Sequence, residues 1–144
     1  MFQTLNRLAV SVLLLGTLAS AAFAGGLNAR VEGPSRDGRT YVIRAYACSD
    51  PASLAVTAWA EGVVNGERRS LPLSLRPLNS KGAYRFERPW PGDGRWLVRV
   101  AFPRANAPVT VATIGRGGRV IDQTLVREGD GRAECDAKLA TVVR

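Results

Sequence analysis

Short stretches of alternating apolar and polar residues constrain the fold of this chain more than any other feature. In the segment RTYVIRAYAC, residues 39–48, Tyr41, Ile43 and Ala45 would lie on one face of a strand and Val42 on the other. Because successive side chains of a strand point to opposite faces, this period of two predicts half-buried antiparallel strands. No segment after residue 25 sustains a helical stripe, so we predict an all-β fold.

Gly, Pro, Asn and Asp interrupt the alternation at short intervals and delimit the expected strands. About eight segments carry the strand pattern: residues 28–32, 39–48, 54–64, 67–75, 82–90, 95–102, 109–114 and 119–126. Asn65-Gly66 joins two of them and predicts a tight hairpin, since a type I′ turn needs positive φ at both central residues. Pro72 cannot donate to a ladder, so its strand is predicted to lie at a sheet edge.

Local turns between short strands are typical of a sandwich or a barrel. We predict a single immunoglobulin-like antiparallel β-sandwich of about seven to eight strands, with a small closed β-barrel as the alternative. Residues 25–144 are enough for one domain with its own core. The C-terminal tail, residues 131–144, alternates only over 139–143. We expect Cys135 to hold this tail near the body, where it adds one more edge strand at most.

The first 24 residues have the three parts of a cleavable secretory signal peptide. Arg7 supplies the positive start, residues 8–18 form an apolar core, and Ala22-Phe23-Ala24 is the small-residue pattern that precedes a cut. We predict Sec-type export with cleavage after Ala24, and therefore a periplasmic or secreted bacterial protein. No later apolar run reaches the ~20 residues of a membrane span, so no transmembrane segment is expected after signal removal.

Two cysteines, Cys48 and Cys135, follow the signal and would reach an oxidising compartment. An even cysteine count there favours a bridge, so we predict a Cys48–Cys135 disulfide. The bridge would close a long loop and stabilise the protein by about 4 kcal/mol, because it restricts the unfolded chain. The wide separation of the two cysteines is not the spacing of a metal motif or of a Cys-x-x-Cys redox pair.

Basic residues outnumber acidic ones. The chain has 20 Lys and Arg against 12 Asp and Glu, and loss of Arg7 with the signal leaves 19 against 12, a net charge of +7. Such a protein attracts anionic surfaces through its long-range potential. For an exported protein we expect anionic lipid, lipopolysaccharide or an acidic partner, and no nucleic acid. Apart from Arg68-Arg69 the basic residues are dispersed, so a merely solvated surface is the competing interpretation.

The chemistry that most enzymes and metal sites need is sparse. The sequence has no histidine, which is the usual general base and the commonest metal ligand, and its single methionine is Met1. Four acidic residues, Glu128, Asp130, Glu134 and Asp136, surround Cys135 but lack the spacing of an EF-hand loop. We therefore predict a non-enzymatic protein with no catalytic residue, no metal and no cofactor.

The stretch YRFERPWPGDGRWLVRVAF, residues 84–102, is the best candidate for a binding surface. Its large apolar groups at alternate positions are expected in the core, whereas its arginines fall on the opposite face. Guanidinium groups bind carboxylate or phosphate in bidentate fashion. The possible anion or partner surface consists of Arg85, Arg88, Trp90, Arg95 and Arg99.

Residues 61–102 resemble a class of small exported bacterial proteins with an immunoglobulin-like sandwich. The shared elements are Gly82-Ala83-Tyr84, Pro91-Gly92 and Gly94-Arg95-Trp96, followed by alternating apolar residues. The arrangement is similar to that of YtkA-like and FixH-like envelope domains. The resemblance implies the same fold, an envelope location and, for some members, copper handling. This chain departs from the copper-handling members because it has no His or mature Met to carry over as ligands.

Three functions remain as hypotheses. The first is a non-catalytic exported β-sandwich that acts as a binding or accessory module in the cell envelope. The second is a basic protein that binds lipopolysaccharide, anionic lipid or an acidic partner. The third, a metal-handling accessory domain, is disfavoured by the missing ligands. A purely structural subunit that adds an edge strand to another protein's sheet is a variant of the first.

Overall fold

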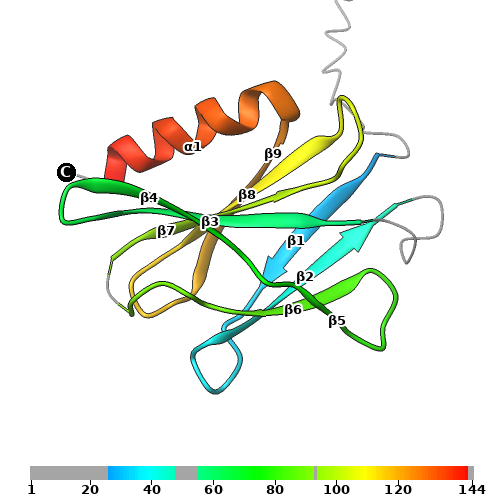
Figure 1. Ribbon diagram of the computed structural model, residues 1–144, viewed down its shortest axis with the longest axis horizontal. Helices are drawn as coiled ribbons and strands as arrows, with labels where there is room; N and C mark the ends of the chain where they lie inside the picture. Colours follow the sequence, from blue (N-terminus) through cyan, green and yellow to red (C-terminus); the bar gives the residue numbers. More distant parts are fainter. Residues whose placement is uncertain (1–25, 48–54, 93, 143–144) are drawn as a thin grey trace, which may run out of the picture.

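The computed structural model describes residues 26–47, 55–92 and 94–142, with side chains for all of these except 128–132 and 142. The predicted signal, its cleavage site after Ala24 and Cys48 lie outside the described residues. Two antiparallel sheets face each other and one helix covers the outside of the larger sheet (Figure 1). The all-β sandwich is thus confirmed. Because both sheets are open, the closed barrel is wrong.

The four-stranded sheet has the order β1-β2-β6-β5 and the five-stranded sheet has the order β4-β3-β7-β8-β9. The first comprises β1 (Asn28–Glu32), β2 (Thr40–Tyr46), β6 (Ala83–Glu87) and the two-residue β5 (Arg76–Pro77). The second comprises β4 (Glu67–Pro72), β3 (Thr57–Val64), β7 (Trp96–Ala101), β8 (Pro108–Ile114) and β9 (Val120–Arg127). The chain passes from one sheet to the other between β4 and β5, which lie at the sheet edges.

Two local predictions about the hairpin of β3 and β4 are confirmed. Asn65 and Gly66 have φ of 53° and 79°, and they join strands that pair in register up to Val64 and Glu67. The return strand β4 lies at the edge of its sheet, as Pro72 requires.

The main core lies between the two sheets. Trp96, Val98, Val100 and Phe102 are all buried there, as the alternation predicts. Trp96 lies flat against Gly62, its cross-strand neighbour, where an added Cβ would come within 2.5 Å of the indole. The absence of a side chain at position 62 therefore makes room for the tryptophan ring.

Side chains of the five-stranded sheet close the free edge of β1. The Thr110 hydroxyl donates to the Ala29 carbonyl (2.8 Å) and accepts from the Ala29 amide (3.3 Å). The Val31 amide donates to Oε1 of Gln123 (2.8 Å). These bonds satisfy backbone groups that would otherwise lack a partner at a sheet edge, and they connect the two layers.

The C-terminal residues form α1 (Glu128–Val142), so the edge strand expected in the tail is wrong. The helix lies across the outer face of the five-stranded sheet (Figure 1), and Cys135 and Leu139 pack there on Leu97 and on β8. Helices of this length are marginal in water, so packing on the sheet must stabilise α1. In the described part of the chain, no helix has the length and apolar character needed to cross a membrane.

Candidate functional site

The five residues predicted to form one anion surface do not come together. Arg85 lies on the outer face of the four-stranded sheet, next to Val42 and Arg76. Arg99 lies on the outer face of the five-stranded sheet, opposite Trp59. The two side chains therefore project from opposite sides of the sandwich. Alternation along the sequence predicts that each arginine lies on the outward face of its own strand. Because β6 and β7 belong to different sheets, these two outward faces lie on opposite sides of the molecule.

Trp90 belongs to the core rather than to a surface. Only 5% of it is exposed, and its ring stacks on Trp96 with centroids 5.6 Å apart. Tyr41 and Phe86 complete this aromatic cluster, and the Tyr41 hydroxyl donates to the Gly118 carbonyl (2.5 Å). The segment that leads into the turn thus directs the Trp90 side chain into the core. Alternation does not predict this burial, because residue 90 lies beyond the end of β6.

Arg88 and Arg95 lie on either side of this turn. Arg95 is exposed, and Arg88 is partly buried. The Arg88 guanidinium is close enough to Gly92 that a Cβ there would meet it at 3.3 Å. Its positive charge also opposes the effect of burial on the pKa of Tyr41, which burial raises above the usual value. Arg88 therefore lies beside both the turn and the aromatic cluster.

The outer face of the four-stranded sheet gathers arginines from all four strands. Strand register places Arg30 directly opposite Arg44 and Arg76 directly opposite Arg85, and we name these four residues the basic sheet face. Nε of Arg44 pairs with Oε2 of Glu32 at 2.9 Å. The other three are exposed and form no ion pair with any residue that the structure describes. Sequence reasoning found Arg85 alone, because the pairing of distant strands sets the other positions.

Two depressions adjoin the basic sheet face. A pocket of about 160 Å³ is lined by Ser74, Arg76, Arg85 and Glu87, among others. At the opposite edge, a groove of about 640 Å³ runs between β1 and β9, with Arg30, Tyr46 and Leu125 in its walls. Both offer polar side chains beside a guanidinium, as an anionic ligand with hydroxyl groups would require.

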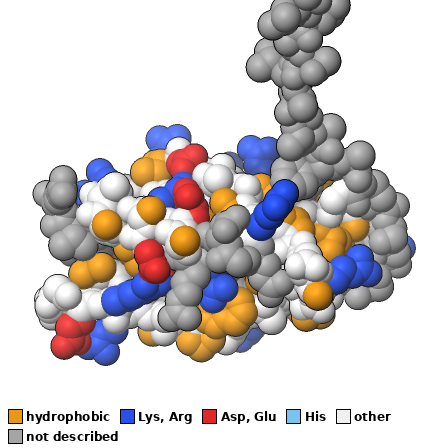
Figure 2. All heavy atoms as spheres, turned by 90° about the horizontal axis from the view of Figure 1, so that it is seen from above, with side chains coloured by type: hydrophobic (Ala, Val, Ile, Leu, Met, Phe, Trp, Pro, Cys, Tyr) orange, Lys and Arg blue, Asp and Glu red, His pale blue; other side chains and the backbone are white. Residues whose placement is uncertain are grey.

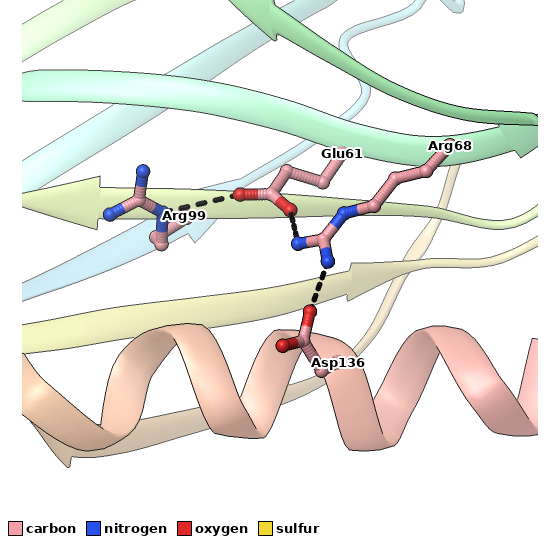
Figure 3. A network of polar contacts seen from close by, with 4 residues as sticks. All are labelled: Glu61, Arg68, Arg99 and Asp136. Atoms are coloured by element: carbon pink, nitrogen blue, oxygen red, sulfur yellow. Dashed lines mark hydrogen bonds and ion pairs between the residues drawn. The ribbon is translucent and has the colours of Figure 1, made fainter.

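On the other side of the molecule, a polar network joins α1 to the five-stranded sheet (Figure 3). Glu61 of β3 is only 4% exposed and lies between two arginines. Arg68 of β4 hydrogen-bonds to Glu61 with one terminal nitrogen and to Asp136 of α1 with the other. Nε of Arg99 lies 3.4 Å from Oε1 of Glu61. The hydrogen bond to Glu61 raises the pKa of Arg68 above its usual range, so this buried carboxylate faces fixed positive charge.

Two side chains, Glu61 and Trp59, contact the guanidinium of Arg99. Its Cζ lies 4.5 Å from the centroid of the Trp59 ring, a cation–π geometry. Nε is buried and has no hydrogen-bond partner in the described structure, whereas 26% of the whole side chain is exposed. Figure 3 shows the two terminal nitrogens pointing away from Glu61.

A second ionic contact attaches α1 to β9. Nζ of Lys138 pairs with Asp122 and donates to Oγ1 of Thr124 (3.1 Å), and Glu134 lies 3.7 Å from the same nitrogen. The hydrogen bond from Lys138 holds the pKa of Asp122 below its ordinary value. Acidic and basic side chains are therefore mixed on the face that carries α1 (Figure 2), in contrast to the basic sheet face.

Cys135 is fully buried on the side of α1 that faces the sheet, where it packs with Leu97, Val109 and Val111 and pairs with no cysteine among the described residues. Burial is the main cause that raises its pKa to about 11. Because Cys48 lies outside the described residues, the disulfide stays a prediction. Ala47, the last described residue before it, packs against the core between the sheets.

The described residues contain no group of three or more His, Cys, Asp or Glu side chains placed to hold a metal ion. Two of the four acidic residues around Cys135 have described side chains, and both face basic groups. Asp136 pairs with Arg68, and Glu134 lies near Lys138.

Comparison with known proteins gives no relative. No protein family, curated protein or solved structure matches this chain. The similarity to YtkA-like and FixH-like domains therefore stays a prediction, and the case for a function depends on the residues themselves.

Proposed function

We propose that this protein is a non-catalytic, exported binding module of the cell envelope that engages a phosphate-bearing lipid surface through its basic sheet face. The observation that carries the proposal is the register of the four-stranded sheet, which sets two arginine pairs directly opposite each other. Like charges in such positions destabilise a sheet, so folding alone does not favour this arrangement. An anionic partner that binds between the arginines would relieve this repulsion, and the relief would contribute to the free energy of binding.

The dimensions suit a surface of headgroups. Neighbouring strands lie about 4.8 Å apart, so the four arginines extend over roughly 15 Å. Each guanidinium can bind a phosphate in bidentate fashion. Within the described residues only Glu32 and Glu87 share this face, and Glu32 is already paired with Arg44. The face therefore keeps an excess of positive charge.

The immunoglobulin-like architecture is part of the proposal. The order β1-β2-β6-β5 follows that of strands A, B, E and D in immunoglobulin domains, and β4-β3-β7-β8 follows C′, C, F and G. On this interpretation β9 extends one sheet and α1 covers it, whereas the outer face of the other sheet carries no additional element among the described residues. Export rests on the signal pattern of residues 1–24 and the non-catalytic role on the missing histidine.

Vesicle binding tests the function. The exported protein is expected to sediment with vesicles of phosphatidylethanolamine and phosphatidylglycerol at low salt, and to dissociate at high salt. Basic residues near an anionic surface contribute about 1 kcal/mol each. The double variant Arg76→Ala/Arg85→Ala should therefore bind about 30-fold more weakly.

The matched control is Arg104→Ala/Arg116→Ala, which removes the same charge from exposed positions elsewhere. It should bind within about twofold of the unchanged protein. Equal weakening of both variants would mean that net charge alone attracts the vesicle, and failure to bind at low salt would overturn the proposal. A second arm with lipopolysaccharide, and a third with inorganic phosphate, identify the source of the phosphate group.

A further inference from the structure

We propose that Arg99 and Trp59 form a second binding site, for a carboxylate of a partner polypeptide, on the outer face of the five-stranded sheet. The site is independent of the basic sheet face, because it lies on the opposite side of the sandwich. It needs only the side chains of two neighbouring interior strands.

The Arg99 side chain is preorganised for binding. β3 and β7 are both interior strands, and Arg99 and Trp59 are directly opposite in their register. Glu61 approaches Nε from one side and the indole supports the guanidinium from below. An exposed arginine loses rotamer freedom when it binds a ligand, whereas this one has already lost it on folding. Preorganisation of this kind increases affinity without adding contacts.

The terminal nitrogens of Arg99 form no polar contact with the described residues. Its only described polar contact is between Nε and Glu61. Since Nε is buried, the exposed quarter of the side chain belongs to other atoms, and the terminal nitrogens point away from the network (Figure 3). A guanidinium has five N–H donors, so the terminal pair can still donate two parallel hydrogen bonds.

The geometry around Arg99 favours a carboxylate as the ligand. A guanidinium stacked on an indole is approached most easily in its own plane, and a planar carboxylate fits that approach with two parallel hydrogen bonds. Trp59 is partly exposed and lies opposite Pro72, which gives the carbon atoms next to the carboxylate an apolar support. A broad lipid surface fits less well, because α1 covers part of the same sheet (Figure 1) and the charges there are mixed.

Local charge sets the expected salt dependence. Arg68 and Arg99 are balanced by Glu61 and Asp136, so the network is neutral as a whole. Attraction to the site must then come from short-range hydrogen bonds and packing on Trp59. Binding should weaken little with ionic strength, in contrast to binding at the basic sheet face.

A nuclear magnetic resonance titration tests the site. The exported protein labelled with ¹⁵N is titrated at physiological salt with an N-acetylated, C-amidated tetraglutamate peptide. Saturable shifts are expected at the Arg99 Nε–H and at the Trp59 indole N–H, while the buried Trp90 and Trp96 indoles stay unchanged. The corresponding tetraglutamine peptide should cause no shift.

Arg99→Lys keeps the charge but loses the planar fork, and it should weaken binding about tenfold or more. Trp59→Leu keeps Arg99 and removes its support, so it should also weaken binding and provides a second test if Arg99→Lys does not fold. Arg95→Lys, at an exposed position, is the control that should bind normally. Undiminished binding by Arg99→Lys, or shifts confined to the basic sheet face, would overturn the proposal. Equal shifts with inorganic phosphate would overturn the carboxylate assignment. None of these outcomes depends on the vesicle assay.

Discussion

Glu61 is the residue on which the polar network under α1 depends. It is a buried carboxylate on a strand whose other outward positions are neutral, and it contacts both Arg68 and Arg99. Burying a charge is costly unless it is paired and hydrogen-bonded. Alternation along β3 does not predict the burial of Glu61, because the helix that covers it comes from the far end of the sequence.

Replacing Glu61 by alanine should lower the free energy of unfolding by about 2 to 3 kcal/mol. Loss of one partner of a fully buried pair costs about 3 to 5 kcal/mol, but Arg68 and Arg99 keep some exposure and water can reach them. Urea unfolding measures the change. In the control, Glu67→Ala breaks an exposed pair with Arg69 and should cost less than about 0.5 kcal/mol. Similar losses in the two variants would contradict the structural role of Glu61.

Gly62 is expected to tolerate no side chain. In Gly62→Ala the new Cβ would come within 2.5 Å of the Trp96 ring, and this ring is buried and stacks on Trp90. Overpacking of this kind costs about 1 to 3 kcal/mol, so the midpoint of thermal unfolding should fall by several degrees. Gly92→Ala is the control, since its Cβ would meet only the flexible end of Arg88 at 3.3 Å. An unchanged midpoint for Gly62→Ala would show that the ring can move aside.

At the scale of elements, strands were predictable from the sequence and the helix was not. The period of two is visible in β2 and β7 because each buries one complete face, as Tyr41 and Ile43 do in β2. In α1, only Cys135 and Leu139 among the described side chains are buried. A helix that meets its sheet along so narrow a stripe gives almost no periodic signal.

The thiol of Cys135 gives α1 a pH dependence in the reduced protein. Burial raises its pKa to about 11 from 9.0, so the folded state retains a proton that the unfolded state releases above pH 9. The contribution of this thiol to the free energy of unfolding is therefore fully present below pH 9 and is lost as the pH rises from 9 to 11. Urea unfolding of reduced protein across this window should show the decline.

Cys135→Ala should flatten this decline, although the variant is less stable overall because it leaves a cavity under α1. Tyr41 also titrates at alkaline pH, but it contributes equally to both proteins. The change of stability with pH is thus the informative quantity. The same decline in the two proteins would show that the thiol does not couple to folding.

At the scale of the whole molecule, the basic sheet face shows why a site can escape sequence reasoning. Its residues belong to segments that look unrelated along the chain, and only the pairing of β1 with β2 and of β5 with β6 aligns them. The sequence identified Arg85 and Arg99 correctly as outward-facing, yet it could not assign β6 and β7 to different sheets. The face of a strand on which a residue lies follows from the local sequence, whereas the residues beside it on that face depend on how the strands are ordered in the sheets.

The predicted Cys48–Cys135 bridge would connect the two layers of the sandwich. Tyr46, at the end of β2, lines the same groove as Leu125 of β9, the strand that leads into α1. Cys135 itself is fully buried in the cluster around Leu97. A disulfide needs the two Cα atoms within about 7 Å.

Mass spectrometry of the exported protein under non-reducing conditions decides the question. The bridged form is expected to be about 2 Da lighter than the reduced form, to take up no alkylating reagent when unfolded, and to lose about 4 kcal/mol of stability on reduction. Cys48→Ala should then abolish the effect of reductant. Two alkylated cysteines in the unreduced protein would contradict the bridge, and the alkaline decline attributed to Cys135 would then apply to the exported protein as it stands.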